Sequence, residues 1–221
     1  MTEPARLQRD YRRTDWDESM PGDDELVDAL RRSWIERLPL DGRIARLAAE
    51  VDEDWPNARV LAGQFFVDLD AALVFFLTRN RLHDIRFFAE FFQHHIVRDA
   101  LPEIGALRWS PEAAAASDHV ARMGPRLGFE LLDGWRTLGR LASRLSHGGV
   151  YRGGGFRDPH VIELVEGVAE GAFGGRRSEA LSYHSWMPWS EWFDGEFEDS
   201  SYFWLDRRTG LTTVLLITDG P

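Results

Sequence analysis

The sequence contains no cysteine and no lysine, and all 26 of its basic residues are arginine. Without cysteine the chain has no disulfide, no thiolate nucleophile and no cysteine-ligated zinc or iron–sulfur centre. Without lysine it cannot form a Schiff base with pyridoxal phosphate, and it has neither a Walker A lysine nor a kinase-type lysine. These chemistries are excluded. We attribute the arginine bias to a GC-rich bacterial genome rather than to function.

Long hydrophobic runs and excess positive charge are also missing. The longest apolar run, "AALVFFL" at residues 71–77, is far shorter than the roughly 20 residues that span a bilayer. The first twenty residues are charged and lack the apolar region of a signal peptide. The formal net charge of −11 argues against non-specific nucleic-acid binding, which needs a positive surface. We therefore expect a cytoplasmic protein that binds neither membrane nor nucleic acid.

The length and apolar content predict one globular domain. The chain has 221 residues, of which 43% are hydrophobic, and this is enough for a sizeable core. Residues 1–21 are charged and poorly periodic, so they predict a flexible N-terminal arm. We expect residues 22–221 to form the domain, with a helical part at 22–175 and an aromatic-rich β element at 176–221.

Hydrophobic periodicity predicts helices over most of the domain. Residues 23–38 and 42–51 read as amphipathic helices, and residues 58–99 read as a hairpin of two buried helices. The C-terminal stretch "SSYFWLDRRTGLTTVLLITDGP" reads as a strand, a turn and a second strand. The predicted fold is α+β and mostly α: a bundle of about six to seven helices with a C-terminal β-hairpin packed on it. Whether the hairpin leaves an open edge for β-augmentation is not determined by the sequence.

The stretch "FFAEFFQHHIVRD" at residues 87–99 combines four phenylalanines with a glutamate and two adjacent histidines. On the predicted hairpin, Glu90 and His94 share a helix face, and Asp68 on the first helix lies level with His94. The three residues are candidate ligands for iron, manganese or zinc, or for a haem. The alternative is a buried polar network that holds the hairpin in register. The spacings Glu-x-x-His and His-Glu-x-x-His are both absent from the chain, which favours the network and no cofactor.

The segment at residues 183–204 is crowded with aromatic and acidic residues. Such a surface could anchor a basic protein partner, and exposed tryptophans could bind a sugar. A small satellite core is the alternative interpretation. The candidate partner-binding residues are Trp186, Trp189, Trp192, Glu196, Glu198 and Asp199.

The function favoured by these observations is a non-enzymatic bacterial partner-binding protein, immunity-like or an accessory subunit, that uses the acidic aromatic surface. Its expected partner is a protein with a basic surface. One alternative is a metal- or haem-dependent helical-bundle enzyme with its site on the 58–99 hairpin. The second alternative is a carbohydrate-binding protein that uses the three tryptophans.

Overall fold

The centre of the molecule is a six-stranded antiparallel sheet with the strand order β1-β2-β6-β5-β4-β3. The computed structural model describes residues 11–108, 127–149, 155–195 and 199–219. Within these ranges the strands are β1 (Trp34–Leu38), β2 (Ala58–Asp68), β3 (Glu130–Leu132), β4 (Ala180–Ser185), β5 (Ser200–Asp206) and β6 (Leu211–Asp219).

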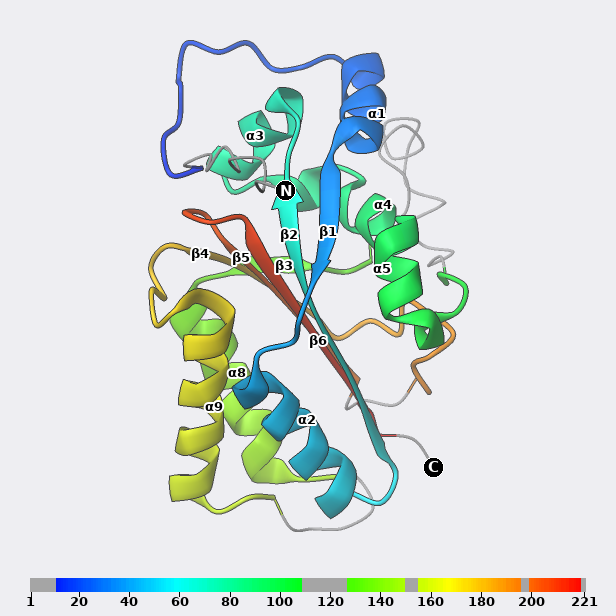
Figure 1. Cartoon of the computed structure of the whole chain (residues 1–221), viewed down its shortest axis with the longest axis vertical. Helices are drawn as coiled ribbons and strands as arrows, with labels where there is room; N and C mark the ends of the chain where they lie inside the picture. Colours follow the sequence, from blue (N-terminus) through cyan, green and yellow to red (C-terminus); the bar gives the residue numbers. More distant parts are fainter. Residues whose placement is uncertain (1–10, 109–126, 150–154, 196–198, 220–221) are drawn as a thin grey trace, which may run out of the picture.

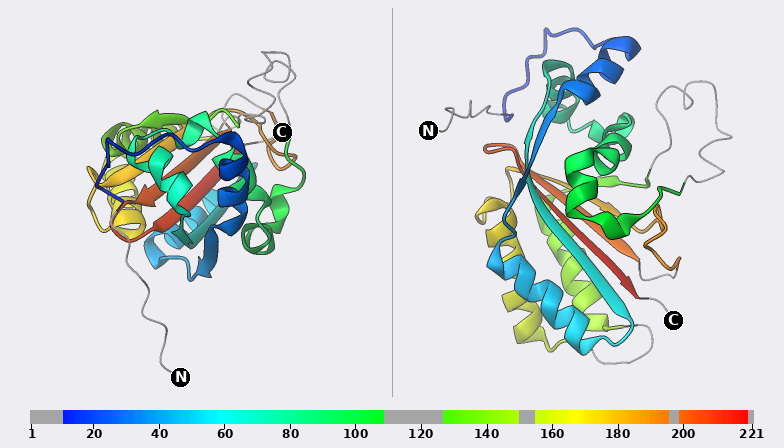
Figure 2. Two further views of the ribbon diagram at one scale, coloured as in Figure 1. Left: turned by 90° about the horizontal axis from the view of Figure 1, so that it is seen from above. Right: turned by 45° about the vertical axis from the view of Figure 1, so that its right-hand side comes forward.

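Helices form a layer on each side of this sheet (Figures 1 and 2). One layer holds α2 (Gly42–Asp54), α8 (Gly134–His147) and α9 (Asp158–Phe173). The other holds α1 (Asp23–Arg32), α3 (Ala71–Thr78), α4 (Phe87–Gln93) and α5 (His95–Ala100), with the 3₁₀ turns η1 (Leu82–Asp84) and η2 (Pro102–Ile104). None of the helices in the described ranges is both long and apolar enough to cross a membrane.

The central strands β5 and β6 are buried on both faces because each face of the sheet carries its own hydrophobic core. Along β5, Phe203 packs in the core shared with α4, whereas Tyr202 and Trp204 pack in the core shared with α2, α8 and α9. β6 alternates in the same way, with Val214 on the first face and Leu215 on the second. Successive side chains of a strand point to opposite faces, so a strand covered on both faces is buried along its whole length and is mostly apolar in its middle, as β5 is.

The predicted helical bundle with a C-terminal hairpin is wrong, and the 58–99 segment shows why. Its first 11 residues form the strand β2 rather than a helix, and the rest is broken into α3, η1, α4 and α5. An unbroken apolar run has no period that distinguishes a buried helix from a strand covered on both faces. Asp70, which lies inside the predicted hairpin, is instead the N-cap of α3 and accepts a hydrogen bond from the backbone N–H of Ala72.

Three further strands replace predicted helix or were not anticipated. The helix expected at residues 23–38 ends at Arg32, and β1 follows it; β3 and β4 add the far edge of the sheet. The C-terminal strand–turn–strand is confirmed as β5 and β6, paired from Ser200↔Ile217 to Leu205↔Thr212. β6 also pairs with β2 along its other side, so this hairpin lies inside the sheet.

The predicted N-terminal arm is described from residue 11 onwards. Tyr11 is buried, its N–H donates to the carbonyl of Arg207 at 2.9 Å, and its hydroxyl donates to Asp68 at 3.2 Å. The chain is therefore attached to the sheet at Tyr11, while residues 1–10 lie outside the described ranges.

Candidate functional site

Two of the three candidate metal ligands have other partners. Asp68 ends β2, and its carboxylate accepts the hydroxyl of Tyr11. Glu90 lies one turn beyond Arg86, and the two side chains form an ion pair at 2.8 Å. Each carboxylate is thus held by a neighbour within the chain.

His94 lies at the junction of α4 and α5, where its Nδ1 accepts the backbone N–H of Ile96 at 3.3 Å. Burial, and then the charge of His95, lowers the pKa of His94. Throughout the described ranges no three or more His, Cys, Asp or Glu side chains form a group that could hold a metal ion. Asp68, Glu90 and His94 are not brought together, so this donor set does not fit a metal.

The three tryptophans spaced by three do not share a surface. Trp189 is 2% exposed and lies 4.4 Å from the ring of Phe92, and Trp192 is 5% exposed. Trp186 is 46% exposed. The segment has no helical span that would place every third residue on one face. Trp189 and Trp192 belong to the main hydrophobic core on the α4 side of the sheet rather than to a small satellite core, and Trp186 lies at the surface.

The acidic candidates of this segment divide in the same way. Asp199 is fully buried, and it accepts hydrogen bonds from the hydroxyl of Thr218 and, at 2.9 Å, from the N–H of Gly195. Glu196 and Glu198 lie outside the described residues. Asp199 therefore links Gly195 to Thr218 of β6 through its hydrogen bonds and is not available to a partner.

Trp186 belongs to a cluster around the buried His184. The two rings meet edge to face with their centroids 4.0 Å apart, and the guanidinium of Arg140 lies 5.5 Å from the centroid of the tryptophan ring. Arg140 also lies 2.9 Å from Nδ1 of His184 and pairs with Glu130. Burial, aided by the positive charge of Arg140, lowers the pKa of His184 to about 3. The imidazole is therefore neutral at pH 7, accepts from Arg140 at Nδ1, and holds Trp186 in place.

A site that the sequence did not reveal lies beside the part of β2 that extends beyond the end of β1. β1 pairs with β2 only from Trp34↔Asp68 to Leu38↔Gln64. The remaining part, Ala58–Gly63, pairs with β6 on one side and with no other described strand on the other. We call this segment the β2 edge; in Figure 1, β2 continues well beyond the end of β1. It is an open sheet edge of the kind that can accept another strand.

Two hollows follow one another along the β2 edge. The acidic hollow, about 510 Å³, is lined by Ala58–Leu61 together with Asp52, Glu103, Glu191 and Trp192. The apolar hollow, about 300 Å³, is lined by Ala62–Phe65 together with Arg37, Leu38, Pro39, Leu40 and Ala100. Every residue from Ala58 to Phe65 therefore borders one hollow or the other, and we call the two neighbouring hollows together the groove.

Negative charge dominates the acidic hollow. Its one base, Arg59, is already bound: it pairs with Asp194 at 2.8 Å and donates to the carbonyl of Trp192 at 2.9 Å. Asp52 accepts the backbone N–H of Val60 at 3.0 Å, and partial burial raises the pKa of its carboxyl. Glu103 and Glu191 are exposed. A cation entering the hollow would meet carboxylates with no competing free base among its lining residues.

The residues that follow β1 explain why this strand ends at Leu38 and leaves the groove open beside β2. Pro39 has no N–H to extend the ladder, and the chain turns towards α2 through Asp41, whose N–H donates to Oε1 of Gln64 at 2.7 Å. Gln64 in turn donates to the carbonyl of Gly171 at 2.9 Å and to the hydroxyl of Thr213 at 3.0 Å. The proline was the one signal in the sequence, but it becomes informative only when residues 34–38 are recognised as a strand.

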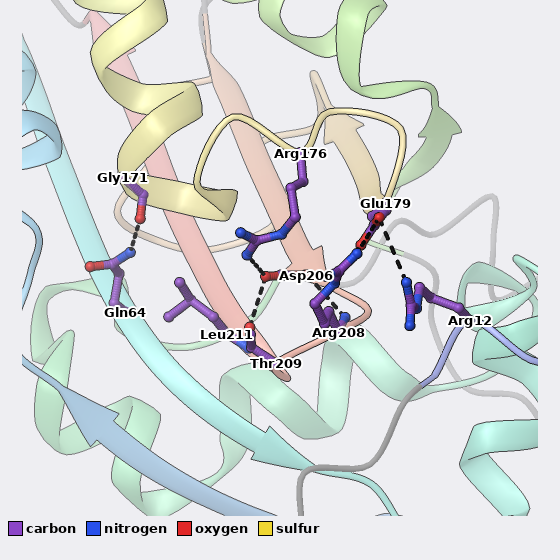
Figure 3. A network of polar contacts seen from close by, with 9 residues as sticks. All are labelled: Arg12, Gln64, Gly171, Arg176, Glu179, Asp206, Arg208, Thr209 and Leu211. Atoms are coloured by element: carbon purple, nitrogen blue, oxygen red, sulfur yellow. Dashed lines mark hydrogen bonds and ion pairs between the residues drawn. The ribbon is translucent and has the colours of Figure 1, made fainter.

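A second polar cluster lies at the β5–β6 turn, and its polar groups bond to one another (Figure 3). Asp206 is fully buried; it accepts the N–H of Arg208 at 2.9 Å, the hydroxyl of Thr209 at 2.8 Å and an N–H of Arg176. Arg208 also pairs with Glu179 at 2.7 Å. Both carboxylate oxygens of Asp206 accept hydrogen bonds from groups of the chain itself. We therefore interpret the cluster as a structural element that stabilises the β5–β6 hairpin, and we call it the clamp.

Replacing Asp206 with alanine is expected to lower the free energy of unfolding by about 1–3 kcal/mol, because buried hydrogen-bond donors lose their acceptor. Urea unfolding followed by circular dichroism measures the change. The control is Glu166→Ala, which removes the partner of Arg177 at an exposed position and should cost less than about 1 kcal/mol. Equal losses in the two variants would contradict the clamp.

Comparison of the chain with protein-family models, with curated proteins and with solved structures found no match in any of the three.

Proposed function

We propose that this chain is a non-enzymatic partner-binding protein, immunity-like or an accessory subunit, that receives a basic region of another protein in the groove along the β2 edge. The observation that carries the proposal is the composition of the acidic hollow. Asp52, Glu103 and Glu191 face a space of about 510 Å³, and the only base among the lining residues, Arg59, is neutralised by Asp194.

The charge of the whole chain supports the same partner chemistry. The net charge of −11 attracts a basic partner at long range, and carboxylates in a hollow focus that field locally. Part of the acidic aromatic segment contributes: Glu191 and the ring of Trp192 line the hollow, and Asp194 holds Arg59. The segment supports binding through these residues, while Trp189 is in the core.

The test begins with a photo-crosslinking side chain at position 103, in cells that naturally produce the protein. A second crosslinker at position 162 is the control, because Ile162 is exposed on α9 in the opposite helical layer. We expect one basic protein to crosslink from position 103 and not from position 162. Identical crosslinking from both positions would overturn the proposal.

Charge reversal then tests the groove with the purified partner. The double variant Glu103→Arg/Glu191→Arg is expected to bind about tenfold more weakly or worse, mainly through slower association, with the difference shrinking as salt is added. The matched control reverses Glu163 and Glu166 on α9, an equal change of charge at exposed positions. Surface plasmon resonance measures both. An unchanged dissociation constant for the groove variant would refute the assignment.

A further inference from the structure

The backbone of the β2 edge is oriented for strand pairing. The N–H of Val67 donates to Gly210 beside β6, so the odd-numbered residues of β2 direct their backbone groups towards β6. In an antiparallel ladder the direction alternates. Ala58, Val60 and Ala62 therefore direct their backbone groups away from β6; the Ala58 N–H donates to the carbonyl of Trp55 at 3.0 Å, and the Val60 N–H donates to Asp52. The N–H of Ala62 and the carbonyls of the three residues face the open side.

The hollows lie where the side chains of an added strand would go. A strand laid along the β2 edge passes first the apolar hollow, with Leu38 and Phe65 in its walls, and then the acidic hollow, with Asp52, Glu103 and Glu191. In β-augmentation the backbone gives affinity and the pockets beside the edge give specificity. The groove thus offers apolar walls beside the exposed Arg37 at one end, and carboxylates at the other.

We propose that the occupant of this groove is an extended segment of a basic partner, which adds to Ala58–Gly63 as a seventh strand of the sheet. The inference deepens the proposed function and rests on it. The partner segment places an apolar side chain in the apolar hollow and an arginine or lysine among the carboxylates of the acidic hollow. Asp52 caps the Val60 N–H while the groove is empty, and releases it when the incoming backbone carbonyl takes its place.

A second copy of this chain is a poorer occupant than a basic segment. Two copies joined through the same edge would bring the carboxylates of Asp52, Glu103 and Glu191 of one copy towards those of the other. Like charges placed together oppose association, and the net charge of −11 on each copy adds to the repulsion. The Asp52 cap also occupies one of the edge donors, a common protection against self-pairing.

The test uses a random-peptide library displayed on phage, panned against the purified full chain. We expect enrichment of peptides that combine a basic residue with β-branched or aromatic residues. Each selected peptide is then resynthesised with a backbone N-methyl group at successive positions, which leaves the protein unchanged. Methyl groups at alternate positions should weaken binding by about tenfold or more, and those in between by less than about threefold, because only every second N–H of a strand faces its neighbour.

Protein variants supply the reciprocal measurement. Ala62→Pro removes an N–H on the open side, where proline is tolerated, and is expected to weaken peptide binding about tenfold. Ala62→Thr keeps the N–H and a strand-forming side chain, and should change binding by less than about threefold. Thermal melts confirm that both variants fold. If Ala62→Pro does not fold, the alternating effect of N-methylation in the unmodified protein decides alone.

The outcomes separate the two proposals. One outcome is that basic peptides bind more weakly to Glu103→Arg/Glu191→Arg, while N-methylation has no alternating effect and Ala62→Pro does not change binding. This outcome supports the acidic groove and overturns strand addition. Uncharged peptides with full alternation uphold strand addition and overturn the basic partner. No enrichment above an unrelated acidic protein overturns both, and concentration-dependent dimerisation abolished by Ala62→Pro assigns the edge to a second copy instead.

Discussion

Shortening Phe203 to alanine is expected to lower the free energy of unfolding by about 3–5 kcal/mol, the usual cost of truncating a fully buried phenylalanine. The side chain is 0% exposed in the middle of β5. Its ring centroid lies 5.1 Å from that of Phe88, 5.2 Å from that of Phe91 and 5.9 Å from that of Phe87, all in near-perpendicular contacts. Removing the ring leaves a cavity lined by three others and forfeits those contacts.

Two controls separate packing from mere loss of an aromatic ring. Phe203→Leu retains most of the volume and should cost about 1–2 kcal/mol. Trp34→Ala removes a larger ring at a position that is 63% exposed and should cost less than about 1 kcal/mol. Urea unfolding at constant pH gives all three values. A loss below about 1 kcal/mol for Phe203→Ala would contradict the packing of α4 on the sheet.

This packing shows what the sequence could predict about "FFAEFFQHH". The apolar residues of the stretch are in the core, since α4 buries Phe87, Phe88, Ala89, Phe91 and Phe92. The predicted polar network is not formed, because Asp68 pairs with Tyr11 and Glu90 with Arg86. The predicted neighbour was wrong, because α4 packs on strands of the sheet rather than on a helix at 58–68. Composition shows that a segment is buried, but the partner that buries it depends on contacts distant in sequence.

The groove illustrates a different limit. Its walls come from Asp52 at the end of α2, from Leu38 in β1, from Glu103 in η2 and from Glu191 near the C-terminus. No spacing in the sequence relates these residues, since the sheet alone brings them together. The tryptophan spacing misled for the converse reason: a regular interval implies a shared face only on a regular element, and Trp186, Trp189 and Trp192 lie on none.

The stability of the protein is expected to fall by about 2 kcal/mol between pH 7 and pH 5 through His184 alone. An ordinary histidine has a pKa of 6.5, whereas burial and then the charge of Arg140 lower that of His184 to about 3. Across this interval the unfolded chain therefore binds a proton at His184, whereas the folded chain does not. Stability is full above the unfolded pKa and is lost as the pH falls below it, at about 1.4 kcal/mol per pH unit.

The substitution that tests this origin is His184→Gln, which keeps a hydrogen-bond acceptor for Arg140 but does not titrate. It should lower stability at pH 7, because the ring packed against Trp186 and Tyr202 is lost, and it should flatten the decline between pH 7 and pH 5 by more than half. His147→Gln removes an exposed histidine of α8 and should leave the decline in place. Urea unfolding at each half unit of pH measures the slopes.

The interval from pH 7 to pH 5 separates histidine from the carboxylates whose pKa values are lowered. Asp52, whose pKa burial raises, acts in the opposite direction and does not produce a decline. Neighbouring arginines lower the pKa values of Asp41 and Glu179, so the stability those groups contribute is lost only as the pH falls below about 4.5. His94, whose pKa is lowered by burial, adds to the decline in the same direction as His184 and accounts for the slope that His184→Gln retains. If the variant and the unmodified chain lose stability in parallel, the neutral buried state of His184 is wrong. Glu130, 3.9 Å from Nδ1, would then have to compensate an imidazolium that the positive charge of Arg140 disfavours.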